Sequence, residues 1–190
     1  MESLRGVKKM DAQTNVTSTG QKIRTVDITV TAAMAALVFL GTYIFKIPTI
    51  SGYVHLGDCM ILLTVALFGM KKGAIAGAIG GGLSDFIGGY FYWVVPTLLI
   101  KCMWAIVMGL IMHKVLKDKK GSFLIGAIAG GVLHIIAYTL VRAVLYGGKT
   151  AIIEIPALAF QTGAGIVIGF VIYMLLKKSG VAGRLSGMVK

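Results

Sequence analysis

Residues 80–101 read GGGLSDFIGGYFYWVVPTLLIK and place two charged side chains, Asp85 and Lys101, in a stretch dominated by apolar, aromatic and glycine residues. A single charge at the centre of a membrane helix costs about 3 kcal/mol even on the gentler insertion scales. Charges in such a stretch therefore need a partner or a polar cavity. The glycines that precede Asp85, in GAIAGAIGGGLSD at 73–85, are typical of close helix packing and not of a nucleotide-binding loop.

The composition of the whole chain agrees with a membrane environment. Of 190 residues, 57% are hydrophobic and only 14% are charged, and the mean hydropathy is +0.87. A soluble domain normally has about a quarter of its residues charged. We therefore predict an all-α polytopic membrane protein.

Six apolar stretches follow one another along the chain. A helix needs about 20 apolar residues to cross the hydrocarbon core. Five of the stretches are long enough, and the second is short. Strict alternation of polar and apolar residues is missing, which argues against a transmembrane barrel. We expect six transmembrane helices, at residues 26–45, 57–70, 73–93, 96–116, 122–146 and 156–176.

The basic residues predict the orientation. If six helices alternate, 15 of the 19 Lys and Arg residues fall on one side, in residues 1–24, 71–72, 114–120 and 177–190. The positive-inside rule then places both termini on the cytoplasmic side of the membrane. We expect this membrane to be the bacterial cell membrane. The basic excess is a topology signal with some attraction to anionic lipid, and no nucleic-acid partner is expected. We divide the chain into a flexible arm (1–24), a membrane domain (25–178) and a cytoplasmic tail (179–190).

Three of the expected helices place an ionisable side chain in the outer half of the membrane: Asp85, Lys101 and Arg142. We expect Asp85 to pair with Lys101 or Arg142, which leaves a spare cation, with Glu154 also available at the outer end of the sixth helix. Such a group indicates a polar cavity that opens to the outside. The alternative is a purely structural salt bridge, and for Asp85 both interpretations stay open.

Further polar residues lie near the same level. His134, Tyr138 and Arg142 follow a spacing of four and share one helix face. Gln161 offers an amide in the sixth helix, and Trp104 offers a ring that stacks on a flat ligand. The alternative for His134, Tyr138 and Arg142 is a hydrogen-bond network between helices. The alternative for Trp104 is plain packing.

Two residues flank the start of the second helix. Asp58 is expected to cap that helix, because a carboxylate satisfies free N–H groups at a helix start. His55 lies in the preceding outer loop, within reach of a ligand. No catalytic constellation, metal-ligand cluster or GxxxxGK[ST] phosphate loop is present in the sequence, so we expect no cofactor, no metal and no enzyme activity.

Several motifs together resemble the substrate-binding S components of energy-coupling factor (ECF) transporters. They are HLGD (55–58), FGMKKGAIAG (68–77), GGGLSD (80–85) and PTLLIK (96–101), and the likeness covers residues 26–176. It is strongest to the branch with hydroxymethylpyrimidine-, pyridoxine- and riboflavin-type members. The resemblance implies six helices and a vitamin pocket near the outer face. It also implies two kinds of partner, a membrane coupling subunit and two cytoplasmic ATPases.

The resemblance also assigns a partner contact. In the family, small residues four apart on the first helix pack on the coupling subunit, and AAMAA supplies Ala32 and Ala36 at that spacing. For the substrate, the polar and planar residues favour pyridoxine or hydroxymethylpyrimidine first and riboflavin second. Pantothenate is a further candidate, because two cations would suit its carboxylate. The alternative function is a membrane scaffold with purely structural ion pairs.

Overall fold

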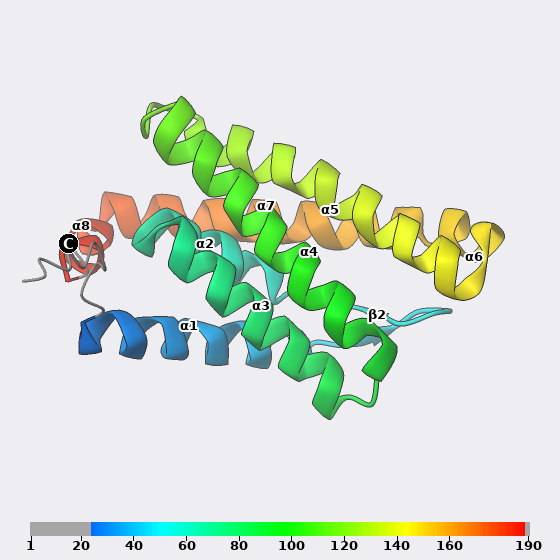
Figure 1. The fold of residues 1–190 in the computed structure, drawn as a ribbon. Helices are drawn as coiled ribbons and strands as arrows, with labels where there is room; N and C mark the ends of the chain where they lie inside the picture. Colours follow the sequence, from blue (N-terminus) through cyan, green and yellow to red (C-terminus); the bar gives the residue numbers. More distant parts are fainter. Residues whose placement is uncertain (1–23, 189–190) are drawn as a thin grey trace, which may run out of the picture.

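The computed structural model describes residues 24–188 (Figure 1). The predicted arm lies outside the described residues apart from Arg24, as do the last two residues of the predicted tail. The described chain is almost entirely helical. Its elements in order are α1 (Thr25–Tyr43), β1 (Ile47–Pro48), β2 (Tyr53–Val54), α2 (Asp58–Phe68), α3 (Met70–Ile87), α4 (Phe91–Gly109), the π-helical η1 (Leu110–Val115), α5 (Ser122–Tyr146), α6 (Gly148–Ile153), α7 (Ile155–Lys178) and α8 (Val181–Gly187).

Each of the six predicted apolar stretches contains a main helix, namely α1 to α5 and α7. In the described part of the chain, four helices are long and apolar enough to cross a membrane: α1, α4 with η1, α5 and α7. Helix α3 is long but carries Lys71, Lys72 and Asp85. Helix α2 has 11 residues, or about 16 Å. The all-helical membrane protein is confirmed, whereas six full spans and the orientation stay predictions.

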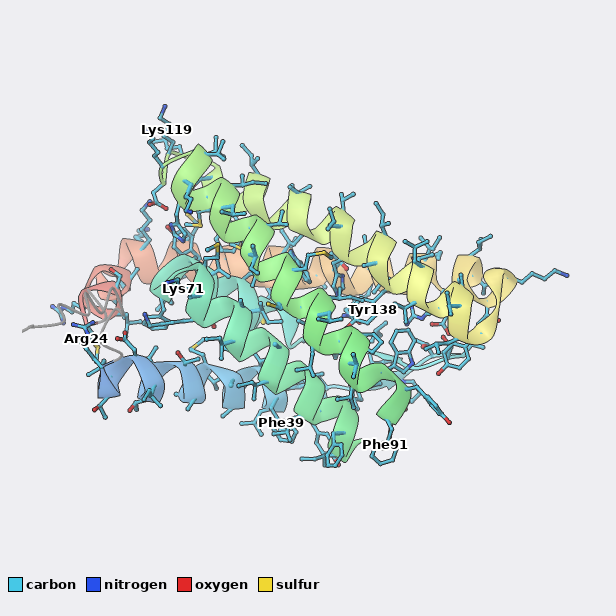
Figure 2. All side chains as sticks on the ribbon, viewed as in Figure 1. Arg24, Phe39, Lys71, Phe91, Lys119 and Tyr138 are labelled. Atoms are coloured by element: carbon cyan, nitrogen blue, oxygen red, sulfur yellow. The ribbon has the colours of Figure 1, made fainter. Side chains whose placement is uncertain are left out.

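Both ends of the described chain lie at the same end of the bundle. Figure 1 shows the start of α1 close to α8, while the β1–β2 hairpin and α6 lie at the opposite end. Arg24, Lys71 and Lys119 all lie at the end that holds α8 (Figure 2). These three basic residues thus lie at one end and the hairpin at the other. This is the arrangement from which the positive-inside rule predicts a cytoplasmic and an outer side.

The shortest main helix is the most enclosed. Eight of the 11 residues of α2 are buried, and the helix packs against α1, α3, α4 and α7. Gly69, at φ +92°, ends α2 and lets the chain turn directly into α3. By contrast, large apolar side chains on the outer faces of α5 and α7 are exposed, such as Leu140, Val144 and Phe160. In a membrane these faces contact lipid.

The glycine triplet of α3 brings three helices together. A Cβ atom at Gly80 would lie 2.5 Å from the Ala35 carbonyl oxygen of α1, and one at Gly81 would lie 2.9 Å from Thr97 Cγ2 of α4. Only hydrogen fits at these points. Asp85, one turn further along α3, is therefore held between α1 and α4, at the end of the bundle that carries the hairpin.

We predict that Gly80→Ala lowers the free energy of unfolding by about 1–3 kcal/mol, because the added methyl group collides with α1 backbone. Gly163→Ala is the matched control: it is an exposed helical glycine whose Cβ would meet nothing within 4 Å, so it should be neutral or slightly stabilising. Thermal unfolding in detergent measures both. Equal midpoints for the two variants would show that α1 and α3 are not in close contact at this site.

Candidate functional site

The most enclosed charges in the described chain form an ion pair between α2 and α4. Lys101 Nζ lies 2.5 Å from Asp58 Oδ1, and their side chains are 1% and 0% exposed. Gly57 is the N-cap of α2, and the two carboxylate oxygens of Asp58 bond the side chains of Lys101 and Gln161. The expectation that Asp58 acts as a helix cap is therefore wrong. Its carboxylate instead neutralises a buried ammonium group, which would otherwise be strongly destabilising in an apolar interior.

This pair is the centre of a buried polar network. Gln161 Nε2 donates to Asp58 Oδ2 at 2.7 Å, and Lys101 Nζ lies 3.1 Å from His134 Nε2. His134 Nδ1 is in turn 3.1 Å from Thr162 Oγ1. The network joins α2, α4, α5 and α7. Because each carboxylate oxygen of Asp58 has a partner, the charge is held without an unpaired atom.

A second ion pair holds the hairpin against the bundle. Arg142 Nε lies 2.9 Å from Glu154 Oε2, between α5 and the residue that joins α6 to α7. The Ser51 backbone N–H donates to Glu154 Oε1 at 2.5 Å, and Arg142 Nε lies 3.2 Å from Ser51 Oγ. Thr49 Oγ1 adds a 3.3 Å contact to Glu154. The turn between β1 and β2 is thus fixed to α5 and to the start of α7.

Asp85 pairs with neither Lys101 nor Arg142, so that expectation is wrong. Both cations have other acidic partners, Asp58 and Glu154. Asp85 Oδ1 instead accepts a hydrogen bond of 2.5 Å from the Tyr53 hydroxyl of β2. The spare cation expected in the pocket does not exist either, because each of the two cations is neutralised.

Lys46, in the loop after α1, lies among aromatic rings near Asp85. Its Nζ is 4.4 Å from the ring centres of Tyr43 and Tyr53 and 5.4 Å from that of Tyr90. It donates to the Ser84 carbonyl at 3.2 Å. Burial lowers the pKa of Lys46, and the negative charge of Asp85 opposes that shift. Lys46 therefore joins α1, the hairpin and the α3–α4 connection at the hairpin end of the bundle.

A pocket opens between the hairpin and the ends of α1, α3, α4, α5 and α7. Its solvent-accessible volume is about 40 Å³, within about 420 Å³ of space between atoms that includes open solvent. Its wall has aromatic, amide, hydroxyl and charged side chains. The lining residues are Thr42, Gly52, Tyr53, His55, Asp85, Trp93, Thr97, Tyr138, Arg142, Leu158 and Gln161.

One side of the pocket is aromatic. The Trp93 and Tyr138 rings stack with centres 5.6 Å apart and an angle of 28° between their planes. The Arg142 guanidinium lies over Trp93 at 5.5 Å, and the Tyr138 hydroxyl donates to Thr97 Oγ1 at 2.9 Å. The rings are held in fixed positions, which suits a flat ligand.

His55 presents a neutral imidazole to the pocket. Its ring is buried, and burial lowers the pKa of His55 to about 4. The Gly57 backbone N–H donates to His55 Nδ1 at 3.1 Å, and His55 Nε2 lies 3.4 Å from Gln161 Nε2. The backbone N–H of His55 donates to Gln161 Oε1 at 3.3 Å. At neutral pH this residue adds hydrogen-bonding capacity to the wall without adding charge.

The structure brings five of the sequence-predicted binding residues to the pocket: His55, Asp85, Tyr138, Arg142 and Gln161. The other four lie behind the wall and support it: Lys101, Trp104, His134 and Glu154. Trp104 is completely buried, and its Nε1 donates to the Ala127 carbonyl at 3.1 Å, so the packing alternative holds for this ring. Lys101 and His134 take part in the interhelical network described above.

Sequence reasoning missed several lining residues, chiefly Thr42, Tyr53 and Thr97. Thr42 is in the last turn of α1 and has no polar neighbour in sequence that indicates a site. Thr97, however, lies exactly one turn before Lys101, which was a usable signal. Ala32 and Ala36 are both exposed on α1, whereas Ala35 and Val38 are buried in the bundle. Their shared face is open to a partner.

Comparison with known proteins identifies the family. A family model described as the ECF-type riboflavin transporter, S component, matches residues 22–178. The chain is also similar to an "Uncharacterized protein in gap 3'region" of Pyrococcus woesei, with 36% identity over 132 residues. That match covers 70% of this chain and 87% of the relative. This protein therefore belongs to the family of S components, the vitamin-binding membrane subunits of ECF transporters.

Proposed function

We propose that this pocket binds a flat, uncharged vitamin for uptake, with riboflavin as the first candidate. ATP hydrolysis by partner subunits drives transport in this proposal. The observation that carries it is an aromatic wall beside two cations, Lys101 and Arg142, that are each paired with a carboxylate. Most of the polar side chains that line the pocket are neutral hydrogen-bonding groups and not charged ones.

The charge balance argues against an anionic substrate. In the described part of the chain, three cationic side chains surround the pocket (Lys46, Lys101, Arg142), and so do three acidic ones (Asp58, Asp85, Glu154). Lys101 and Arg142 are each engaged by a carboxylate, so a carboxylate or phosphate ligand would have to displace one. Pantothenate therefore ranks last.

The choice among neutral vitamins rests on shape and on the family. Pyridoxine, hydroxymethylpyrimidine and riboflavin are all planar and rich in hydrogen-bonding groups. Riboflavin has the largest ring system to stack on Trp93 and Tyr138, and the matching family model is a riboflavin one. We therefore place riboflavin ahead of hydroxymethylpyrimidine and pyridoxine, which reverses the order that the sequence alone favoured.

Coupling requires partners, and α1 offers the surface for them. No GxxxxGK[ST] phosphate loop occurs in the 190 residues, so ATP hydrolysis is assigned to other subunits. Ala32 and Ala36 form an exposed small-residue face on α1, and such faces let a second helix approach closely in a membrane. We assign this face to the coupling subunit, in a bacterial cell membrane.

A scaffold protein is the alternative function. It would explain the Lys101–Asp58 and Arg142–Glu154 pairs as structural bonds between helices. It gives no reason for an aromatic wall beside a polar cavity. Ligand binding separates the two functions.

The first test of the proposed function concerns the aromatic wall. Trp93→Leu should weaken riboflavin binding about 10-fold or more, because aromatic stacking on a ring contributes about 1–3 kcal/mol. Tyr92→Leu is the matched control, since Tyr92 is the preceding residue and is 81% exposed. Quenching of riboflavin's own fluorescence in a titration measures both affinities. Unchanged binding by Trp93→Leu would remove Trp93 from the site.

The second test concerns the partner surface. Ala32→Trp or Ala36→Trp should prevent co-purification with the coupling subunit and ATPases expressed beside it, because a large ring blocks the close approach of a helix. Riboflavin binding should be unaffected. Ala159→Trp, which alters an exposed alanine on α7, is the control. Intact complexes with both α1 variants would place the coupling surface elsewhere.

A further inference from the structure

A second open cavity lies along α7, away from the pocket beneath the hairpin. Its solvent-accessible volume is about 570 Å³, within about 930 Å³ of space that includes open solvent. The pocket beneath the hairpin has about 40 Å³ by the same measure, so the second cavity has room for a larger occupant. The described residues that line it all belong to α7, and we call this surface the α7 groove: Phe170, Val171, Met174, Leu175, Lys177 and Lys178.

The α7 groove is apolar along its length and basic at one end. Helical residues three and four apart are neighbours on the helix surface. The lining therefore forms two adjacent rows, which are Phe170, Met174, Lys177 and Val171, Leu175, Lys178. Each row ends in a lysine in the last turn of α7. The rows extend about 12 Å along the helix, which is most of the half of a hydrocarbon core that belongs to one leaflet.

The groove faces away from the rest of the bundle. Gly169 of α7 packs on α2, since a Cβ atom there would lie 3.4 Å from the Cys59 carbonyl oxygen. Successive helical residues are rotated by about 100°, so Val171 and Met174 point to the opposite side. They are 50% and 47% exposed. Because α7 is long and apolar enough to cross a membrane, this face is open to lipid.

Aromatic contacts with α5 hold one side of the groove in place. The rings of Phe170 and Tyr173 lie 5.7 and 5.1 Å from the ring of Phe123, measured between ring centres. Lys177 Nζ lies 5.8 Å from the centre of the Tyr173 ring. The apolar wall and the ammonium group at its end are thus fixed relative to each other.

No carboxylate neutralises the two lysines at the basic end. The ion pairs within residues 24–188 include neither Lys177 nor Lys178. Asp118, the acidic residue of the α4–α5 connection, lies 2.8 Å from His113. The groove therefore differs from the pocket beneath the hairpin, where Arg142 is engaged by Glu154. Two ammonium groups at the end of an apolar groove match an anionic headgroup that carries an acyl chain.

We propose that the α7 groove binds one anionic phospholipid from the leaflet at the α8 end of the bundle. An acyl chain lies along the Phe170 and Val171 end of the groove, and the headgroup phosphate contacts Lys177 and Lys178. A zwitterionic lipid has the same chains, but its own positive group competes with the lysines for the phosphate. This inference goes beyond the proposed function and does not depend on which vitamin binds, or on whether one does.

Competition between two lipids tests the proposal on the intact chain. The protein is reconstituted in vesicles with equal parts of dioleoyl-phosphatidylglycerol and dioleoyl-phosphatidylcholine, and retained lipid is identified by native mass spectrometry. The wild type should retain one phosphatidylglycerol, with a preference of about 10-fold or more over phosphatidylcholine. Equal retention of the two lipids would overturn the proposal.

Charge variants locate the bound lipid. Lys177→Gln with Lys178→Gln should lower the preference about fivefold for each lysine removed. Lys119→Gln with Lys120→Gln is the matched control, because it removes the same charge outside the groove, and Lys119 lies at the same end of the bundle (Figure 2). An unchanged preference in the groove variant, or an equal loss in both variants, would overturn the proposal.

A size variant tests the apolar part and the other possible occupants. Val171→Trp fills the groove and should reduce retention of phosphatidylglycerol, whereas Val167→Trp, an exposed change one turn earlier and outside the groove, should not. If Val171→Trp instead dissociates a dimer and leaves lipid retention unchanged, the groove is an interface between two copies and the proposal is overturned. Binding of soluble glycerol phosphate as tightly as the whole lipid would also overturn it.

Discussion

The structure depends on the neutralisation of its buried charges. The most deeply buried pair is Lys101–Asp58. Lys101 extends from the middle of α4 and Asp58 stands at the start of α2, the helix that the others enclose. Without the pair, either group would be an isolated charge in an apolar bundle. With it, Asp58 also fixes Gln161, and Lys101 approaches His134. The network behind the pocket wall therefore joins four helices.

The two buried ion pairs have different positions and different consequences. Lys101–Asp58 lies behind the pocket wall and ties the helices to one another. Arg142–Glu154 contacts Ser51, so it ties the hairpin to α5 and to the start of α7. A binding subunit needs both a rigid site and a cover over it. The hairpin is thus attached to the helices by polar bonds to Arg142 and Glu154, separately from the network around Lys101 and Asp58.

The sequence predicted the helices well because their signal is local. Long apolar stretches and glycine-rich packing motifs depend on neighbouring residues, and the helices lie where those patterns indicate. Depth along a helix was also predictable, since Asp85, Arg142 and Gln161 do meet in one cavity. The rotation of each helix about its own axis was not predictable. Trp104 and Trp93 are both on α4, yet the sequence favoured the wrong one as the ring that faces the pocket.

Ion partners were the least predictable feature. Asp58 is 43 residues from Lys101, and an acid at a helix start is usually explained by capping. Its role follows only when α2 is placed next to α4. The same holds for Glu154, whose partners include Ser51 in a hairpin more than 100 residues earlier. Pairings at such separations are decided by tertiary packing, which no periodicity in the chain encodes.

The central claim, that buried charge pairing holds together the helices behind the pocket wall, is tested most directly by a double-mutant cycle on Lys101 and Asp58. The measurement is the free energy of unfolding in detergent for Lys101→Met, Asp58→Asn and the double variant. Each single change should cost about 3–5 kcal/mol, because it leaves an unpaired buried charge. The double variant should lose far less than the sum. Two small, additive losses would contradict the account.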